Sequence, residues 1–223
     1  MKCMILAAGY GKRMMPLTKE IPKPLLKIGN ETLLDRNIRN VLSNGLDEII
    51  INVSYHGDKI KEHLMKNYKD HKITLVEEAH PYGTGGALVN AKDHLGDETI
   101  LIINADIFHD FDLSKLNRET ECIHLVGIEN PDHNKDGDFN IGPDGKVFRD
   151  DINQLTWSGI SLLNTDVLSK IDNNNFPFDS WSSIVLPQIK EGKVTGEIYS
   201  DIWLDVGTKD RLELANKIIR EEN

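Results

Sequence analysis

Short apolar runs alternate with longer amphipathic stretches along most of the chain. The runs are four to six residues long and rich in Ile, Leu and Val, which is typical of buried β-strands. Their alternation with helical patterns indicates repeated βα units around a mainly parallel sheet. The predicted strands are Met4–Ala7, Glu48–Val53, Ile73–Val76, Ile100–Ile103, Ile123–Ile128 and Ser158–Leu163.

The stretches between these runs carry apolar residues at helical spacing. Leu34, Ile38 and Leu42 fall on one face of a predicted helix, and Gly45 follows as its expected C-cap. The last helix has a charged face, which we interpret as solvated. Besides the first, the predicted helices are Lys59–Asn67, Gly86–Leu95 and Leu212–Ile219.

The composition predicts one soluble domain, residues 1–223. No stretch rich in Pro, Gly or Ser divides the chain, and 223 residues can bury a substantial core. Hydrophobic residues make up 39% of the chain, yet no apolar run reaches the ~18 residues of a membrane span. The apolar start is too short for a signal peptide, so we expect a cytoplasmic protein without a membrane partner.

Charge and cysteine content narrow the function further. The formal net charge of −10 disfavours nucleic acid as a partner, because an acidic surface repels a phosphate backbone. Cys3 and Cys122 each lie in an apolar run, so we predict two reduced core thiols rather than a disulfide or a zinc site. The chain nevertheless contains one basic loop, and a basic loop in an acidic protein indicates that it binds a small anion together with a cation.

That basic loop follows the first predicted strand. Gly9 and Gly11 let the backbone turn and bring N–H groups close to an anionic ligand. Arg13 and Lys23 add a guanidinium fork and a movable ammonium, both suited to phosphate oxygens. The dinucleotide fingerprint would need a glycine at Met14, and the P-loop pattern also fails, so the loop belongs to another class of phosphate site.

Two carboxylates follow apolar runs elsewhere in the chain. Asp106 comes soon after the predicted strand that ends at Ile103, and Asp205 closes a short apolar run. In open α/β sheets, ligands bind beyond the carboxyl ends of the strands, where the basic loop also emerges. Mg²⁺ usually takes one or two protein carboxylates, so we predict that both residues hold Mg²⁺. The alternative for either one alone is a helix N-cap or a turn acid.

Two further segments are less specific. Gly83-Thr84-Gly85-Gly86 precedes a predicted helix and would let a nucleobase or phosphate approach the backbone; the alternative is a turn capped by Thr84. Residues 132–151 are predicted to leave the sheet as an irregular excursion. The excursion begins like a calcium loop, but Pro143 stands where the closing Glu would be, so we reject calcium binding.

A polar turn is predicted at Asn173-Asn174-Asn175.

The remaining reactive side chains carry weak signals. None of the eight histidines pairs with another at metal-ligand spacing, and we assign no catalytic role to His56, His80 or His133. Ser158 lacks the flanking glycines of a nucleophile elbow, which disfavours a hydrolase triad.

The basic loop reads G-x-G-x-R-x-x-P-L-T-x-x-x-P-K-P from Gly9 onwards. It resembles the signature of the sugar-1-phosphate nucleotidyltransferases, which make nucleoside-diphosphate sugars. The resemblance extends over essentially the whole chain. It includes Glu129-Asn130-Pro131, Gly137-Asp138-Phe139, Ser158-Gly159-Ile160-Ser161, Gly192-Lys193-Val194 and Trp203-Leu204-Asp205-Val206-Gly207-Thr208.

This resemblance implies a Rossmann-like fold with a mixed, mainly parallel sheet flanked by helices, the nucleotide-diphospho-sugar transferase fold. The later segments resemble members that transfer a uridylyl group from UTP to N-acetylmuramate 1-phosphate in peptidoglycan recycling, releasing pyrophosphate. It further implies Mg²⁺ as cofactor, with Asp106 and Asp205 as ligands and Arg13 and Lys23 as catalytic cations. The nucleotide residues implied are Ala8, Gly9, Gly11, Lys12, Arg13, Lys23 and Gly83, and the sugar residues are Asp138, Asn140 and Gly159.

Two alternative functions stay open. The turn at residues 83–86 is also like the base-binding turn of sugar-1-phosphate guanylyltransferases, so mannose or heptose 1-phosphate with GTP is a second possible substrate pair. A catalytically silent nucleotide-sensing module would bind an NTP on the same fold without turnover, although intact Arg13, Lys23, Asp106 and Asp205 argue against it. We expect a monomer or a small homo-oligomer.

Overall fold

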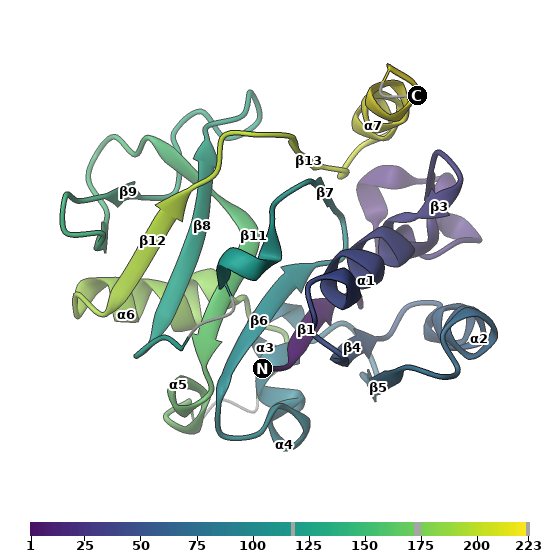
Figure 1. Ribbon diagram of the computed structural model, residues 1–223, viewed down its shortest axis with the longest axis horizontal. Coiled ribbons are helices and arrows are strands. Elements are labelled where there is room, and N and C mark those ends of the chain that lie inside the picture. Colours follow the sequence, from purple (N-terminus) through teal and green to yellow (C-terminus); the bar gives the residue numbers. More distant parts are fainter. Residues whose placement is uncertain (117–118, 172–174, 222–223) are drawn as a thin grey trace.

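A seven-stranded sheet of order β12-β8-β11-β6-β1-β4-β5 forms the centre of the computed structural model, which describes residues 1–116, 119–171 and 175–221 (Figure 1). Neighbouring strands are parallel except at β11, which runs antiparallel to β6 and β8. The sheet is therefore mixed and mainly parallel, as predicted. Its strands are β1 Cys3–Leu6, β4 Glu48–Val53, β5 Lys72–Glu77, β6 Thr99–Asn104, β8 Ile123–Glu129, β11 Leu155–Asn164 and β12 Val194–Ile198.

Helices cover both faces of this sheet. One face packs against α1 and α2, and the other against α3, α4, α5 and α6. Successive side chains of a strand point to opposite faces, so Ile5 joins the first core and Met4 the second. Strands buried on both faces read as continuous apolar runs, which is why the sequence revealed them. The helices are α1 Leu33–Ser43, α2 Gly57–Asn67, α3 Gly83–Asn90, α4 Lys92–Leu95, α5 Asp166–Ser169, α6 Leu186–Lys190 and α7 Lys209–Glu221.

The first predicted helix is confirmed, but its C-cap is the residue before the predicted Gly45. At the start of α1, the Thr32 hydroxyl accepts a hydrogen bond from the Asp35 N–H while the Asp35 carboxylate accepts one from the Thr32 N–H. This reciprocal pair is a capping box. The helix ends at Ser43 with Asn44 as its C-cap, and Gly45 then takes a left-handed conformation with φ 77°.

The single helix predicted at Gly86–Leu95 is wrong in two respects. The chain forms two helices there, and the first begins earlier, at Gly83. A Cβ at Gly85 or Gly86 would lie 2.6 Å or 2.7 Å from a phenylalanine ring of the segment 176–178, so these glycines are needed for close packing. Thr84 does not cap the helix, because its hydroxyl accepts a hydrogen bond from the Ser180 N–H at 2.9 Å.

Three short strand pairs and the edge strand β12 were not in the predicted set of strands. Two hairpins are formed by β2 Lys27–Ile28 with β3 Glu31–Thr32, and by β9 Asn140–Ile141 with β10 Val147–Phe148. The second hairpin lies within residues 132–151, which leave the main sheet as predicted. An antiparallel ribbon joins β7 Ile107–His109 to β13 Trp203–Asp205. Of the predicted polar turn at 173–175, residues 173 and 174 lie outside the described residues.

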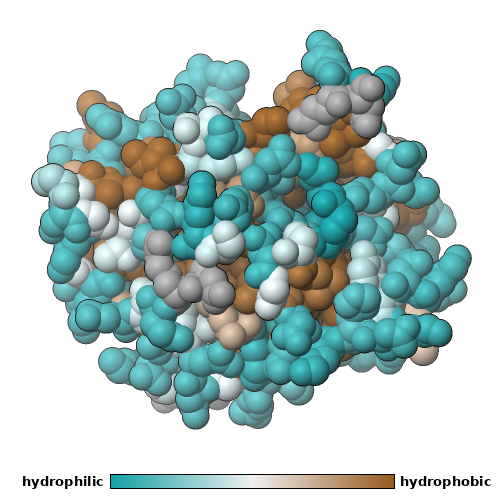
Figure 2. Space-filling model, in the orientation of Figure 1, coloured by the Kyte–Doolittle hydropathy of each residue, from teal (hydrophilic) through white to brown (hydrophobic). Residues whose placement is uncertain are grey.

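A third, smaller core holds the basic loop to the C-terminal helix. Met14 from the loop, Phe108 from β7 and Ala215 from α7 are all fully buried in it. Figure 2 shows a mainly hydrophilic face, with hydrophobic residues exposed beside α7. Cys3 and Cys122 are free and buried on opposite faces of the sheet. In the described parts of the chain, no helix is long and apolar enough to cross a membrane.

Candidate active site

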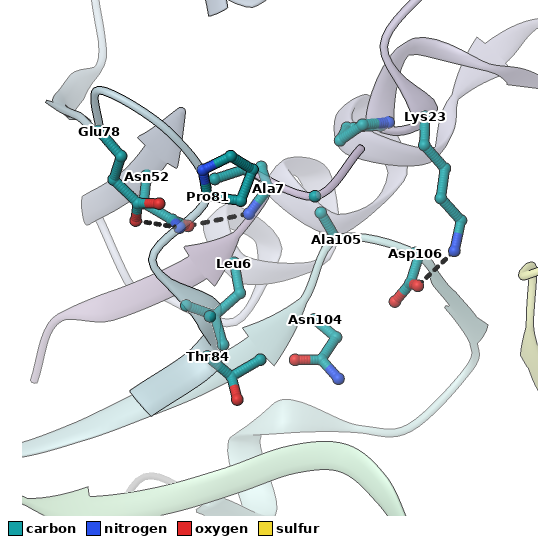
Figure 3. A pocket seen from close by; sticks show the side chains of 14 residues that line it. Leu6, Ala7, Lys23, Asn52, Glu78, Pro81, Thr84, Asn104, Ala105 and Asp106 are labelled. Atoms are coloured by element: carbon teal, nitrogen blue, oxygen red, sulfur yellow. Dashed lines mark hydrogen bonds and ion pairs between the residues drawn. The ribbon is translucent and has the colours of Figure 1, made fainter. Parts of the chain in front are cut away.

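A cavity of about 210 Å³ opens where the central strands end (Figure 3). Its wall combines the turn after β1, the carboxyl ends of β4 and β6, and the start of α3. This is the edge at which open α/β sheets bind ligands. The lining residues are Leu6, Ala7, Ala8, Gly9, Lys23, Pro24, Asn52, Glu78, Pro81, Gly83, Thr84, Asn104, Ala105 and Asp106.

A buried polar network fixes one side of this cavity. The Asn52 side chain accepts a hydrogen bond from the Ala7 N–H at 2.9 Å and donates one to Glu78 at 2.8 Å. The second Glu78 oxygen accepts from the Tyr82 N–H at 2.8 Å. Burial raises the pKa of Glu78, although these hydrogen bonds oppose the shift. The network therefore joins the ends of three strands to the start of α3.

The opposite side of the cavity carries Asp106, the first of the two predicted carboxylates, while Asp205 lies outside the cavity lining. The Lys23 ammonium forms an ion pair with Asp106, and Asp205 Oδ1 lies 4.0 Å from the same nitrogen (Figure 3 shows the first pair). The Lys23 side chain is only 11% exposed, so this contact is shielded from bulk water. One lysine thus lies close to both carboxylates.

The two carboxylates come together for a different reason from the one expected. Asp106 follows β6 at the carboxyl edge of the main sheet, but Asp205 ends β13, which pairs only with β7 in the described structure. In that ribbon Asp205 lies opposite Ile107, and the Val206 N–H donates to the Asp106 carbonyl at 2.9 Å. An antiparallel ribbon, and not the parallel sheet, brings Asp205 to the site.

The basic loop lies beside these groups. Gly11 has φ 61°, and a Cβ there would lie 2.9 Å from the Thr18 side chain, so the turn requires glycine. A Cβ at Gly9 would meet open space next to the cavity. The far end of the loop is held by α2 and its cap: the His56 ring contacts the Lys19 carbonyl at 2.9 Å, and the Lys59 ammonium donates to the Glu20 carbonyl.

Two residues without a predicted role contact Asp205. Arg211 Nη1 on α7 lies 3.0 Å from Asp205 Oδ2, and His133 Nε2 lies 3.7 Å from the same oxygen. Burial and the positive charges of Arg211 and Arg13 lower the pKa of His133, although Asp205 acts in the opposite direction. A Cβ at Gly207 would crowd the guanidinium groups of both arginines, at 2.5 Å and 3.1 Å. The Arg13 guanidinium from the loop therefore lies close to the backbone at Gly207.

The predicted sugar residues lie further along β11 and in the excursion, outside the cavity wall. The Asp138 carboxylate accepts hydrogen bonds from Asn134 at 3.1 Å and from the Trp157 N–H at 2.8 Å. The Asn140 amide is bonded to backbone atoms of Ile152 and Gln154, so both side chains brace the excursion. Gly159, with φ 81°, packs against the Asn104 side chain, which lines the cavity.

Sequence reasoning therefore missed several residues of the site. Asn52 is the penultimate residue of one predicted strand and Glu78 follows another, and such positions could have marked them as they marked Asp106. No sequence pattern marked Arg211 or His133 as site residues, because their contacts join α7 to the distant segment 132–151. Of the predicted nucleotide residues, Gly11, Lys12 and Arg13 belong to the loop but do not line the cavity itself.

A phosphate-type loop, two carboxylates and a cavity thus lie together near the ends of the central strands. Residues 2–124 match the family described as nucleotidyl transferase. The chain belongs to this family, and within it to the sugar-1-phosphate nucleotidyltransferases.

Two relatives match almost the full chain. It is 31% identical to the N-acetylmuramate alpha-1-phosphate uridylyltransferase of Neisseria meningitidis serogroup B, over 98% of both chains. It is 29% identical to the D-glycero-alpha-D-manno-heptose 1-phosphate guanylyltransferase of Campylobacter jejuni, over 94% of this chain and 96% of the relative. The fold is similar to that of HddC from Yersinia pseudotuberculosis, solved with GMP-PN. That similarity has a TM-score of 0.82 at 24% identity and covers 98% and 99% of the two chains.

Proposed function

We propose that the protein transfers a uridylyl group from UTP to N-acetylmuramate 1-phosphate and releases pyrophosphate, in peptidoglycan recycling. The observation that carries this proposal is the 31% identity to the Neisseria uridylyltransferase over 98% of both chains. The convergence of Lys23, Asp106 and Asp205 beside a phosphate-type loop supports the chemistry.

In this reaction an oxygen of the sugar phosphate attacks the α-phosphorus of the nucleotide, and pyrophosphate leaves in line. The attacking phosphate is already ionised near neutral pH, so the protein needs no nucleophile and no general base. Its task is to hold two polyanions together and to neutralise their charge. Arg13 and Lys23 are the catalytic cations in this proposal, and Lys12 with the backbone of Ala8, Gly9 and Gly11 holds the triphosphate.

The residues present fit a hard divalent cation. Asp205 Oδ1 is buried and has no hydrogen-bond partner in the described structure, and Asp106 offers a second carboxylate on the same side. Asp106 and Asp205 would hold Mg²⁺, which when bound would offset the charge of the reacting phosphates. Lys23 would then exchange Asp106 for a phosphate oxygen.

The proposed binding sites for base and sugar use different elements of the fold. Gly83 lines the cavity beside Pro81 and supports a base site there. Gly159 contacts Asn104 from the β11 side, which supports a sugar site beyond the cavity. Asp138 and Asn140 would contribute from the excursion that their own hydrogen bonds hold in shape.

A guanylyltransferase acting on heptose or mannose 1-phosphate is the second candidate. The 29% identity to the Campylobacter guanylyltransferase over nearly the whole chain favours it, as does the glycine-rich turn at residues 83–86. Both candidates use the same catalytic groups and differ only in the base and the sugar.

A substrate panel tests the proposal. Pyrophosphate release is measured as kcat/KM for four NTPs, each against N-acetylmuramate, N-acetylglucosamine, glucose, mannose and heptose 1-phosphates. We expect UTP with N-acetylmuramate 1-phosphate to be the best pair. A clear preference for GTP with heptose or mannose phosphate would replace the first candidate by the second. Tight NTP binding without turnover on any sugar phosphate would instead indicate a silent nucleotide-sensing module.

A further inference from the structure

The Asp205 carboxylate is held by one of its two oxygens. Oδ2 lies 3.0 Å from Arg211 Nη1, and the two side chains are 21% and 14% exposed. Oδ1 is buried, lacks a hydrogen-bond partner in the described structure and faces the Lys23 ammonium at 4.0 Å. A buried carboxylate oxygen without a donor is unfavourable, so its orientation requires a group that holds the other oxygen.

Arg211 is itself fixed from several directions. The backbone N–H of Arg211 donates a hydrogen bond to the Thr208 hydroxyl at 3.4 Å. The side-chain Nη1 of Arg211 contacts the His133 ring at 3.0 Å. The absence of a side chain at Gly207 lets the guanidinium approach Asp205 closely. Further along α7, the Asn216 side chain accepts a hydrogen bond from the Gly29 N–H at 2.9 Å, which fastens the helix to the β2–β3 hairpin. The guanidinium is thus presented to Asp205 by a firmly anchored helix.

We infer that Arg211 is a positioning residue that binds Asp205 Oδ2 and thereby keeps Oδ1 directed toward Asp106 and available to a divalent cation. The inference rests on the metal site of the proposed function. Without Arg211, two other donors lie close enough to take over the carboxylate: Lys23 at 4.0 Å from Oδ1 and His133 at 3.7 Å from Oδ2. Either would turn Asp205 away from the position that it shares with Asp106.

Charge alone makes the opposite prediction. Arg211 is a positive group 3.0 Å from the carboxylate, so its removal would strengthen the attraction of Asp205 for a cation. If Arg211 acts by orientation, its removal weakens cation binding. The sign of the change in affinity therefore separates a positioning role from a purely electrostatic one.

In the first experiment, MnCl₂ alone is titrated into the protein, and calorimetry measures the affinity for Mn²⁺. Arg211→Met is compared with Arg220→Met, which removes the same side chain from the exposed end of the same helix, where it contacts only the Asn216 carbonyl in the described structure. We expect at least fivefold weaker Mn²⁺ binding in Arg211→Met, an intermediate loss in Arg211→Lys and no change in Arg220→Met. Equal or tighter binding in Arg211→Met overturns the inference. If circular dichroism shows that Arg211→Met is unfolded, Arg211→Lys is used instead. Equal or tighter Mn²⁺ binding in Arg211→Lys would then overturn the inference.

A double-mutant cycle provides the second experiment. If Arg211 acts through Asp205, Arg211→Met should lower kcat about tenfold in the wild-type background and less than twofold beside Asp205→Asn. Equal losses in both backgrounds overturn the inference. Absence of pyrophosphate release from the wild type would reject the proposed function, while the Mn²⁺ series would still decide the role of Arg211. Absence of Mn²⁺ binding by the wild type would reject the metal site and the inference together.

Discussion

The Lys23 ammonium pairs with the Asp106 carboxylate, so the cation proposed for the triphosphate is neutralised by a proposed metal ligand. The second carboxylate, Asp205, is paired with Arg211 in the same way. Both carboxylates thus have a basic partner before any substrate binds. Substrate binding would require Lys23 to exchange its carboxylate for a phosphate, which makes its charge central to turnover.

Replacing Lys23 or Arg13 by Ala should lower kcat/KM by about 10²–10³-fold, roughly 3–4 kcal/mol in transition-state terms. Each change removes a positive charge proposed to face the reacting phosphates. Folding should survive, because Arg13 is exposed and the loop core is formed by Met14 and Thr18. Loss of Lys23 leaves Asp106 unpaired, but the Asp106 side chain is 33% exposed and can be hydrated. Steady-state kinetics with circular dichroism measure both effects. Near-normal turnover in both folded variants would mean that the loop is not the triphosphate site.

Asp106→Asn and Asp205→Asn should each require far more Mg²⁺ and retain little activity while the protein stays folded. The substitution keeps the size of the side chain and removes the charge that a hard cation prefers. The measurement is a Mg²⁺ titration of kcat. Asp112→Asn is the control, because Asp112 is exposed and its side chain accepts hydrogen bonds from Ser114, away from the cavity lining. An unchanged Mg²⁺ titration with normal kcat in Asp205→Asn would reduce that residue to a turn acid.

The central strands could be predicted because they are apolar on both faces. The strand β12 could not, because it lies at the edge of the sheet and its residues Thr195, Gly196 and Glu197 interrupt the apolar pattern. The start of α3 was missed for a related reason. Glycine disfavours a helix, and only the packing of Gly85 and Gly86 against residues 176–178 makes the helix begin at Gly83.

Some site residues could be predicted from the sequence and others could not. The loop residues belong to a glycine-rich turn and Asp106 follows a strand end, and both are local patterns that a sequence shows directly. The ribbon that brings Asp205 to Asp106 pairs segments from distant parts of the chain, and the short apolar run before Asp205 does not reveal its partner strand. The contact between Arg211 and Asp205 depends on that ribbon and on the position of α7, so it required the structure.

Asn52→Ala should destabilise the protein by about 2–3 kcal/mol, because the buried Glu78 carboxylate and the Ala7 N–H each lose a hydrogen-bond partner. The end of β1 and the start of α3 would also lose their common link, so KM for the nucleotide should rise more than kcat falls. Urea unfolding and steady-state kinetics test both effects, with Asn67→Ala on the exposed face of α2 as the control. Equal stability of the two variants would show that the network contributes little.

The stability of the protein should fall in mild acid partly because of His109. Its side chain is buried, its Nδ1 accepts a hydrogen bond from the Phe111 N–H at 3.1 Å, and its Nε2 has no partner in the described structure. Burial, with a smaller contribution from the nearby Arg36 charge, lowers the pKa of His109 from 6.5 to about 4. Between these values the unfolded chain binds a proton that the folded chain does not, so the unfolding free energy decreases as pH falls through this window.

The size of this effect follows from the pKa difference, at about 1.4 kcal/mol per pH unit and roughly 3 kcal/mol in all. His109→Asn keeps an acceptor for the Phe111 N–H and removes the titrating group. Urea unfolding at pH 7.5 and pH 4.5 should therefore reveal a loss of stability about 2–3 kcal/mol smaller in His109→Asn than in the wild type. The exposed His94→Asn serves as the control and should lose as much as the wild type. If His109→Asn and the wild type lose stability in parallel, the imidazole is protonated in the folded protein and the buried neutral form described above is wrong.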